Sequence, residues 1–112
     1  MILTIAQVSD AVFLALLQPQ LVSNITATGT NQATALVLTA AISIVTVTPS
    51  GSGVVLPQSG SPQVVNRGAN DLLVYPSSGW SIEIQAANAP VIIPSGGSAT
   101  FILKSANAWV VT

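Results

Sequence analysis

The sequence predicts a mainly β protein: a small antiparallel β-sandwich or barrel of jelly-roll-like type, preceded by a short N-terminal helix. From about residue 21 onward Thr, Val, Ile and Ser dominate, which favours strands. Clusters of Pro, Gly and Ser predict turns at 49–53, 59–62, 76–79 and 94–97. The length of 112 residues suits a single core. We therefore divide the chain into an N-terminal helical arm, residues 1–20, and a β domain, residues 21–112.

The first 18 residues have the features of a helix. Thr4 and Gln7 fit the spacing of a capping box, and Pro19 ends the helix near Gln18. An apolar stripe follows at helical spacing and is widened by three further side chains: Ile5, Val8, Val12, Ala15 and Leu16, then Phe13, Leu14 and Leu17. Either this helix packs on its own domain or it is an arm that docks on a neighbouring subunit. For the second interpretation the interface residues are Val12, Phe13, Leu14 and Leu17.

Ten strands are predicted after the helix, at 21–28, 35–39, 43–48, 53–56, 63–66, 72–75, 81–85, 91–93, 99–103 and 109–111. The strand at 81–85 alternates cleanly, so Ile82 and Ile84 are expected to face the core and Glu83 to face outward. Two runs, 72–74 and 101–103, are apolar on both faces. Such strands are buried on both sides, and in so small a domain we expect another subunit to cover the second face.

Charged residues are so scarce that several function classes are excluded. They make up 4% of the chain, against roughly 25% in an average soluble protein. There is no His and no Cys, so zinc, haem and iron–sulfur sites lose their usual ligands, and Ser–His–Asp and Cys–His catalysis are ruled out. No cofactor is expected. Two basic residues cannot form the patch that nucleic-acid or anionic-lipid binding needs.

The mean hydropathy of +0.72 raises the question of a membrane span. A spanning helix needs about 20 mostly apolar residues in a row, and the apolar stretch 2–17 is shorter and interrupted by polar side chains. A secretory signal carries a basic n-region, whereas the first basic residue here is Arg67. The sequence therefore predicts no membrane partner, and its low charge indicates a protein that lives inside an assembly.

Few residues are candidates for chemistry. Asp71 and Glu83 are the acids of the β region, and a glycosidase pair needs two carboxylates facing each other across a cleft lined with aromatic side chains. The simpler interpretation is that Asp71 closes the turn at 67–71 and pairs with Arg67. Calcium would need several carboxylates in one loop. We therefore do not expect an enzyme or a metal site.

The two tryptophans allow two interpretations. Trp80 and Trp109 have flat faces that can stack on sugars, but a tryptophan in a small β domain more often belongs to the core or to an interface. We assign both to the expected interface, together with the apolar residues of the arm.

Segments spread over residues 29–111 resemble a β-module of tailed-phage virion proteins, known from head-decoration (cement) proteins, head fibres and tail-associated proteins. The residues that carry this resemblance are 29–35, 38, 53–57, 65–70, 73–76, 79, 82, 87–91, 96–101 and 109, with Asn-Arg-Gly-Ala-Asn at 66–70. The N-terminal helix lies outside it.

The resemblance implies structure rather than chemistry. It implies a tight connection at 66–70, with Gly68 free to take positive φ, and a strand that ends at Tyr75-Pro76. It also implies a homo-oligomer, expected to be a trimer. The leading expectation is a capsid decoration protein that sits on the outer face of a phage head and binds the major capsid protein. The alternative is a head-fibre or tail-associated module for receptor or glycan attachment, with Trp80 as its exposed aromatic platform.

Overall fold

The computed structural model describes residues 20–112, so the predicted helix and Val12, Phe13, Leu14 and Leu17 lie outside the described residues. The described part is mainly β and contains no helix. All ten predicted strands are present, several of them shorter or longer than expected: β1 (Leu21–Thr26), β2 (Leu36–Val37), β3 (Ile42–Val47), β4 (Gly53–Val55), β5 (Gln63–Asn66), β6 (Leu72–Tyr75), β7 (Ser81–Ile82), β8 (Val91–Ile93), β9 (Ser98–Ser105) and β10 (Ala108–Val111). No helix within 20–112 is long and apolar enough to cross a membrane.

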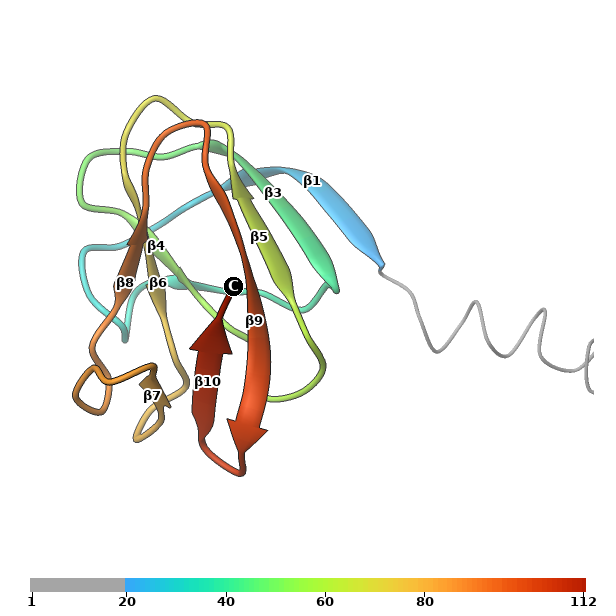
Figure 1. The fold of residues 1–112 in the computed structure, drawn as a ribbon. Coiled ribbons are helices and arrows are strands. Elements are labelled where there is room, and N and C mark those ends of the chain that lie inside the picture. The colour runs from blue at the N-terminus through green and yellow to red at the C-terminus, as the bar shows by residue number, and fades with distance from the viewer. Residues whose placement is uncertain (1–19) are drawn as a thin grey trace, which may run out of the picture.

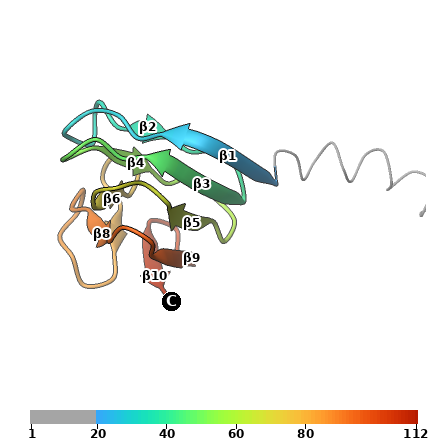
Figure 2. The same ribbon diagram turned by 90° about the horizontal axis from the view of Figure 1, so that it is seen from above.

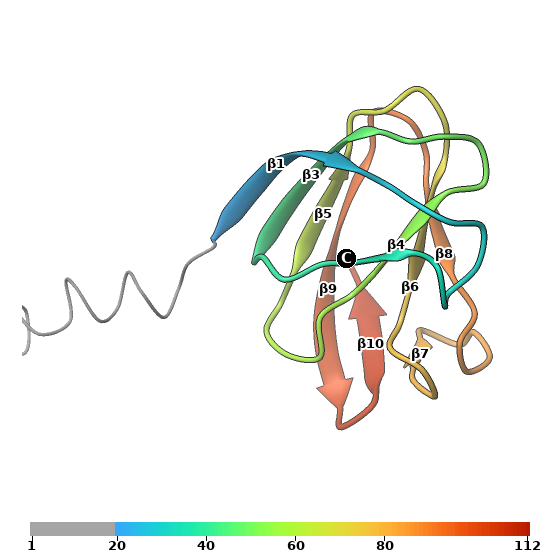
Figure 3. The ribbon, with the colours of Figure 1, turned by 180° about the vertical axis from the view of Figure 1, so that it is seen from behind.

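The strands form two sheets, seen from opposite sides in Figures 1 and 3. One sheet has six strands in the order β1-β3-β5-β9-β10-β7, and the other has four in the order β2-β4-β6-β8. Up to β8, successive strands alternate between the two sheets, and β9 and β10 then both join the six-stranded sheet.

The expected antiparallel, jelly-roll-like arrangement is wrong. Five of the eight strand pairs are parallel, and only β5–β9, β9–β10 and β6–β8 are antiparallel. Parallel neighbours need a long crossover connection, and here each crossover contains a strand of the opposite sheet. Turn-rich sequence between short strands does not distinguish a hairpin from a crossing to the other sheet, so the direction of pairing was not predictable from those turns.

The first six strands form three successive turns of the chain around the core, which we call coils. Each coil has one strand in each sheet: β1 with β2, β3 with β4, and β5 with β6. Leu21 is the register partner of Ile42, and Ile42 that of Gln63, so each coil takes 21 residues to bring the chain back to the same level of the six-stranded sheet, on the next strand. Figure 2 shows the coils in succession from above, with β1 and β2 at one end of the stack and β9 and β10 toward the other. The antiparallel pairs β5–β9, β9–β10 and β6–β8 lie toward that second end.

One core lies between the sheets. The six-stranded sheet contributes Val45, Phe101 and Trp109, and the four-stranded sheet contributes Val54 and Leu72, all almost fully buried in one continuous cluster. The strand alternation that carries these side chains inward leaves the intervening residues on the outer faces.

Strand β7 corrects one prediction. Ile82 is buried in the core as expected, but Ile84 is 98% exposed. The backbone turns at Glu83, which has a φ of 53°, and the amide of Gln85 donates to the carbonyl of Ile82. A turn of this kind breaks the alternation of a strand, so the side chain two residues after Ile82 no longer points to the same side.

Candidate interface on the four-stranded sheet

The outer face of the four-stranded sheet is apolar. Val54, Leu72 and Val74 belong to the core, so their strand neighbours point to the opposite side of the sheet. We call the side chains on that side the outer face: Val37, Val55, Leu73, Tyr75 and Ile92. Ala35, Leu73, Val55 and Tyr75 form a hydrophobic cluster separate from the core.

The register joins the outer face into a continuous strip. Val37, Val55 and Tyr75 are partners across β2, β4 and β6, and Leu73 is the partner of Ile92 across β6 and β8. The middle of the strip is covered within the chain, whereas Val37 is 62% and Ile92 59% exposed at its two ends. Strands β2, β4 and β6 of this sheet are parallel, and parallel strands that are apolar on both sides are normally covered on both sides.

Gly53 allows Tyr75 to lie in this strip. A Cβ atom at Gly53 would come within 2.8 Å of Cε2 of Tyr75 and within 2.6 Å of the Leu73 carbonyl oxygen. Residue 53 must therefore lack a side chain for the ring to cross it, and any larger residue would push Tyr75 off the sheet.

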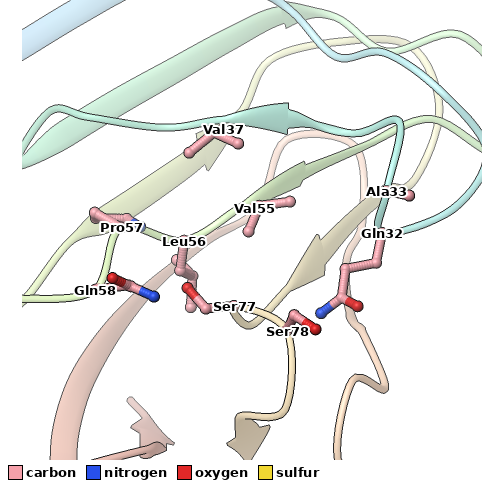
Figure 4. A pocket seen from close by; sticks show the side chains of 9 residues that line it. All are labelled: Gln32, Ala33, Val37, Val55, Leu56, Pro57, Gln58, Ser77 and Ser78. Atoms are coloured by element: carbon pink, nitrogen blue, oxygen red, sulfur yellow. The ribbon is translucent and has the colours of Figure 1, made fainter.

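A hollow of about 510 Å³ opens at the Val37 end of the strip, as Figure 4 shows. Its apolar wall is formed by Val37, Val55 and Leu56. The side-chain amides of Gln32 and Gln58 lie at opposite sides of the hollow. The side-chain amide of Gln32 donates a hydrogen bond of 2.7 Å to the carbonyl of Pro76, which ties the 28–35 loop to the end of β6. The remaining lining residues are Ala33, Pro57, Ser77 and Ser78.

A second hollow, of about 420 Å³, opens at the Ile92 end. Leu73 and Ile92 line one part of it, and the turns that precede β4 and β6 line the rest with Ser50, Gly51, Ala69, Asn70 and Asp71. The exposed ends of the strip thus both border a concave surface with polar groups at the rim, which are neutral at the Val37 end and include the carboxylate of Asp71 at the Ile92 end. This combination of apolar floor and hydrogen-bonding rim is typical of an interface.

Buried Asn66 holds the wall of the second hollow. Its amide nitrogen donates to the carbonyls of Asn70 (2.9 Å) and Ile93 (2.8 Å), and its carbonyl oxygen accepts from the amide of Gly68 at 2.9 Å. Thr48 binds the same loop, because its hydroxyl accepts from the amide of Asn70 at 3.0 Å. These side chains are uncharged, so the hydrogen bonds that hold the turn involve no ionised group.

The expectation that Gly68 takes a positive φ is wrong, although the position does require glycine. Gly68 is not among the glycines with positive φ. Instead its Cα lies so close to the side chain of Thr48 that an added Cβ would collide with it. The glycine is needed for close approach, which is a second reason for glycine that the sequence alone does not separate from the first. The predicted end of β6 at Tyr75-Pro76 is confirmed.

The acids are placed in different surroundings. Asp71 lines the second hollow, whereas Glu83 follows β7 and accepts a hydrogen bond from the amide of Val111 at β10. Among residues 20–112, those that line the first hollow include no ionisable side chain. Within residues 20–112 no group of three or more His, Cys, Asp or Glu side chains could hold a metal ion. The first hollow therefore offers apolar contact and neutral hydrogen bonds, and the second adds one carboxylate.

Trp109, which was expected at the interface, lies in the core. Its side chain is 1% exposed, and the ring of Trp80 lies against it with a centroid distance of 6.1 Å and a tilt of 35°. Trp80 is half-buried and packs on the core. It is therefore a partial cover of Trp109 rather than a free aromatic platform.

Sequence reasoning found the apolar run at 72–74 but missed most of the outer face. Val37, Val55 and Ile92 each lie in a short apolar run, and this was the signal available. Comparison with protein-family models, curated proteins and solved structures gives no match for this chain.

Proposed function

We propose that this protein is a capsid decoration protein, which forms a homo-oligomer, expected to be a trimer, on the outer surface of a phage head and binds the major capsid protein there. The observation that carries the proposal is the uncharged outer face of the four-stranded sheet, with Val37 and Ile92 exposed at its ends. The resemblance of residues 29–111 to virion β-modules supports the same assignment.

The proposed mechanism is burial of apolar surface. Each Å² of apolar surface removed from water contributes about 25 cal/mol, and the contribution is repeated over many copies on a shell. A protein that binds the assembled lattice but not its dissociated subunits stabilises the lattice by mass action. Neutral groups such as Gln32, Gln58 and Ser78 can form hydrogen bonds across such a contact without the cost of desolvating a charge.

For the fold we propose a small β-sandwich preceded by the N-terminal helix, rather than a closed barrel. Each sheet has two free edges among the described strands, β1 and β7 in one and β2 and β8 in the other. A barrel has no edges, whereas a sandwich of two sheets retains them. The location on the capsid exterior and the absence of enzymatic activity belong to the same proposal.

The experiment places a charge on the outer face. Val37→Lys and Ile92→Lys change side chains that are already exposed in the single chain, so the fold should tolerate them. Ile84→Lys is the matched control, because Ile84 is still more exposed and lies off this face. Binding to heads assembled from the major capsid protein encoded with it is measured by co-sedimentation, and oligomer size by analytical ultracentrifugation.

We expect each face variant to weaken head binding or oligomer formation by about tenfold or more, the cost of burying an unpaired charge. The control should bind as the unchanged protein does. Failure of the unchanged protein to bind heads contradicts the decoration function. Equal binding by all three variants contradicts the role of the outer face.

A further inference from the structure

Among the described residues, the stack of coils has no strand or helix beyond its N-terminal end, which we call the open end. Strands β1 and β2, which form the first coil, are the edge strands of their two sheets, and no described strand pairs with their outer sides. Figure 2 shows the two strands together at this end, and β1 begins directly after residue 20, the first described residue. A stack of coils that ends without a cap leaves apolar core surface in contact with water.

Exposed apolar side chains are frequent on the strands nearest this end. Within residues 20–112, five of the eight exposed large hydrophobic residues lie on the first three strands: Leu21, Leu36, Val37, Ile42 and Val47. Leu36 and Val37 line the gap between the two sheet edges, whereas the register partners Leu21 and Ile42 lie on the outer side of the six-stranded sheet. Leu21 is 55% exposed at the start of the edge strand. Edge strands are usually protected by charges or by proline, yet there is no charged residue between positions 11 and 66 and no proline in β1 or β2.

A hollow of about 110 Å³ leads from this end into the core. Val22 lies on β1 and Leu36 on β2, so the hollow opens between the two sheet edges. Ile25 and Leu38 also line it, and both belong to the core cluster. The open end is thus a gap in the cover of the core itself.

We infer that residues 1–19 of the same chain cover the open end. The carbonyl of Gln20 accepts a hydrogen bond of 2.7 Å from the amide of Ile42, so the segment joins the fold at the rim of the opening. The segment has one charge, Asp10, and the helix predicted for it carries an apolar stripe centred on Val12. Between the cap at Thr4 and the end near Gln18 the predicted helix has about 14 residues and is about 21 Å long, enough to span a six-residue strand of about 20 Å. A tethered segment acts at an effective concentration in the mM range, which favours its own chain over a neighbour.

The inference does not rest on the proposed function, and its test needs no capsid. The chain has no cysteine, so any disulfide that forms must join two introduced cysteines. The test pair is Val12→Cys with Leu36→Cys in the full chain. The matched control pair is Val12→Cys with Ile84→Cys, because Ile84 is 98% exposed and follows β7, the edge strand opposite β1 in the six-stranded sheet. Dilute protein is oxidised, and the products are identified by non-reducing gels and peptide mass spectrometry.

The test pair should form a disulfide within one chain about tenfold faster than the control pair, because a docked segment raises the local thiol concentration. Equal rates for the two pairs overturn the inference. Disulfides that join only different chains overturn it as well, since they assign the segment to a neighbouring copy.

A second measurement avoids the geometry of a disulfide. Val12→Glu places a charge in the centre of the apolar stripe, and Gln7→Glu is the matched control at a polar position of the same segment. If the segment covers the open end, Val12→Glu should raise the binding of a hydrophobic dye several-fold over the control at unchanged β-sheet circular dichroism. Equal dye binding by the two variants contradicts the inference.

Discussion

At the scale of single residues, uncharged hydrogen bonds order the loops that shape the candidate interface. Asn66 is completely buried and makes three hydrogen bonds, which reach the 66–70 turn and the end of β8. The hydroxyl of Ser95 adds a bond of 2.6 Å to the carbonyl of Gly68. A buried amide with its partners in place fixes a loop without any charge, which fits a surface that is to be covered.

Replacing Asn66 by Ala should destabilise the fold by about 2–4 kcal/mol, because buried partner groups lose their hydrogen bonds. For a domain of this size the melting temperature falls by about 4–8 °C for each kcal/mol. Thermal and urea unfolding followed by circular dichroism measure the change. Asn107→Ala, at an exposed position, is the control and should change stability by less than about 0.5 kcal/mol. A similar loss in both variants would contradict the structural role of Asn66.

At the scale of elements, β7 shows how one backbone angle decides which residues enter the core. Ile82 and Ile84 are identical side chains two positions apart, and strand alternation assigns both to the core. The positive φ of Glu83 ends the strand between them, so Ile82 is fully buried and Ile84 fully accessible. Burial therefore followed the backbone and not the hydrophobic pattern.

The two isoleucines give a matched pair of variants. Ile82→Ala should lower the free energy of unfolding by about 2–5 kcal/mol, since it removes buried methyl groups and leaves a cavity. Ile84→Ala should change it by less than about 0.5 kcal/mol, because the side chain is already in water. Urea denaturation measures both. Comparable losses would mean that the strand continues through Glu83.

At the scale of the whole molecule, charged residues are scarce on the surface as well as in the core. Four charged residues lie in the β domain. Among residues 20–112, Asp71 is the one charged side chain in the lining of the hollows at the outer face of the four-stranded sheet and at the open end of the coils. Association through such surfaces depends on apolar burial, and ion pairs contribute little to it.

The proposed oligomer should therefore be nearly insensitive to sodium chloride. We expect its dissociation constant to change by less than about threefold between about 0.05 M and about 0.5 M, because screening acts on charges. Sodium sulfate should tighten the association, since excluded salts strengthen apolar burial. Sedimentation equilibrium measures both effects. A strong weakening by sodium chloride would show that charged residues hold the copies together.

The sequence predicted the number and approximate positions of the strands in the β domain. Strands at 63–66, 72–75 and 91–93 have the predicted bounds, because Pro, Gly and Ser mark turns by their own local dihedral preferences. The predicted end at Pro76 has the same local cause. Of the candidate interface, the sequence indicated the doubly apolar run at 72–74, but it also assigned Trp109 to a surface where the structure buries it.

Tertiary structure alone decided which strands are neighbours. The parallel coils, the register of Leu21 with Ile42, and the joining of Val37 to Ile92 across four strands all depend on contacts between residues far apart in the chain. Turn residues determine where a strand stops but not which strand lies beside it. The sequence by itself thus determined the strands and the lack of charge, because both are local or compositional. The outer face and the open end arise from pairing between strands far apart in the sequence, so they could be identified only from the tertiary structure.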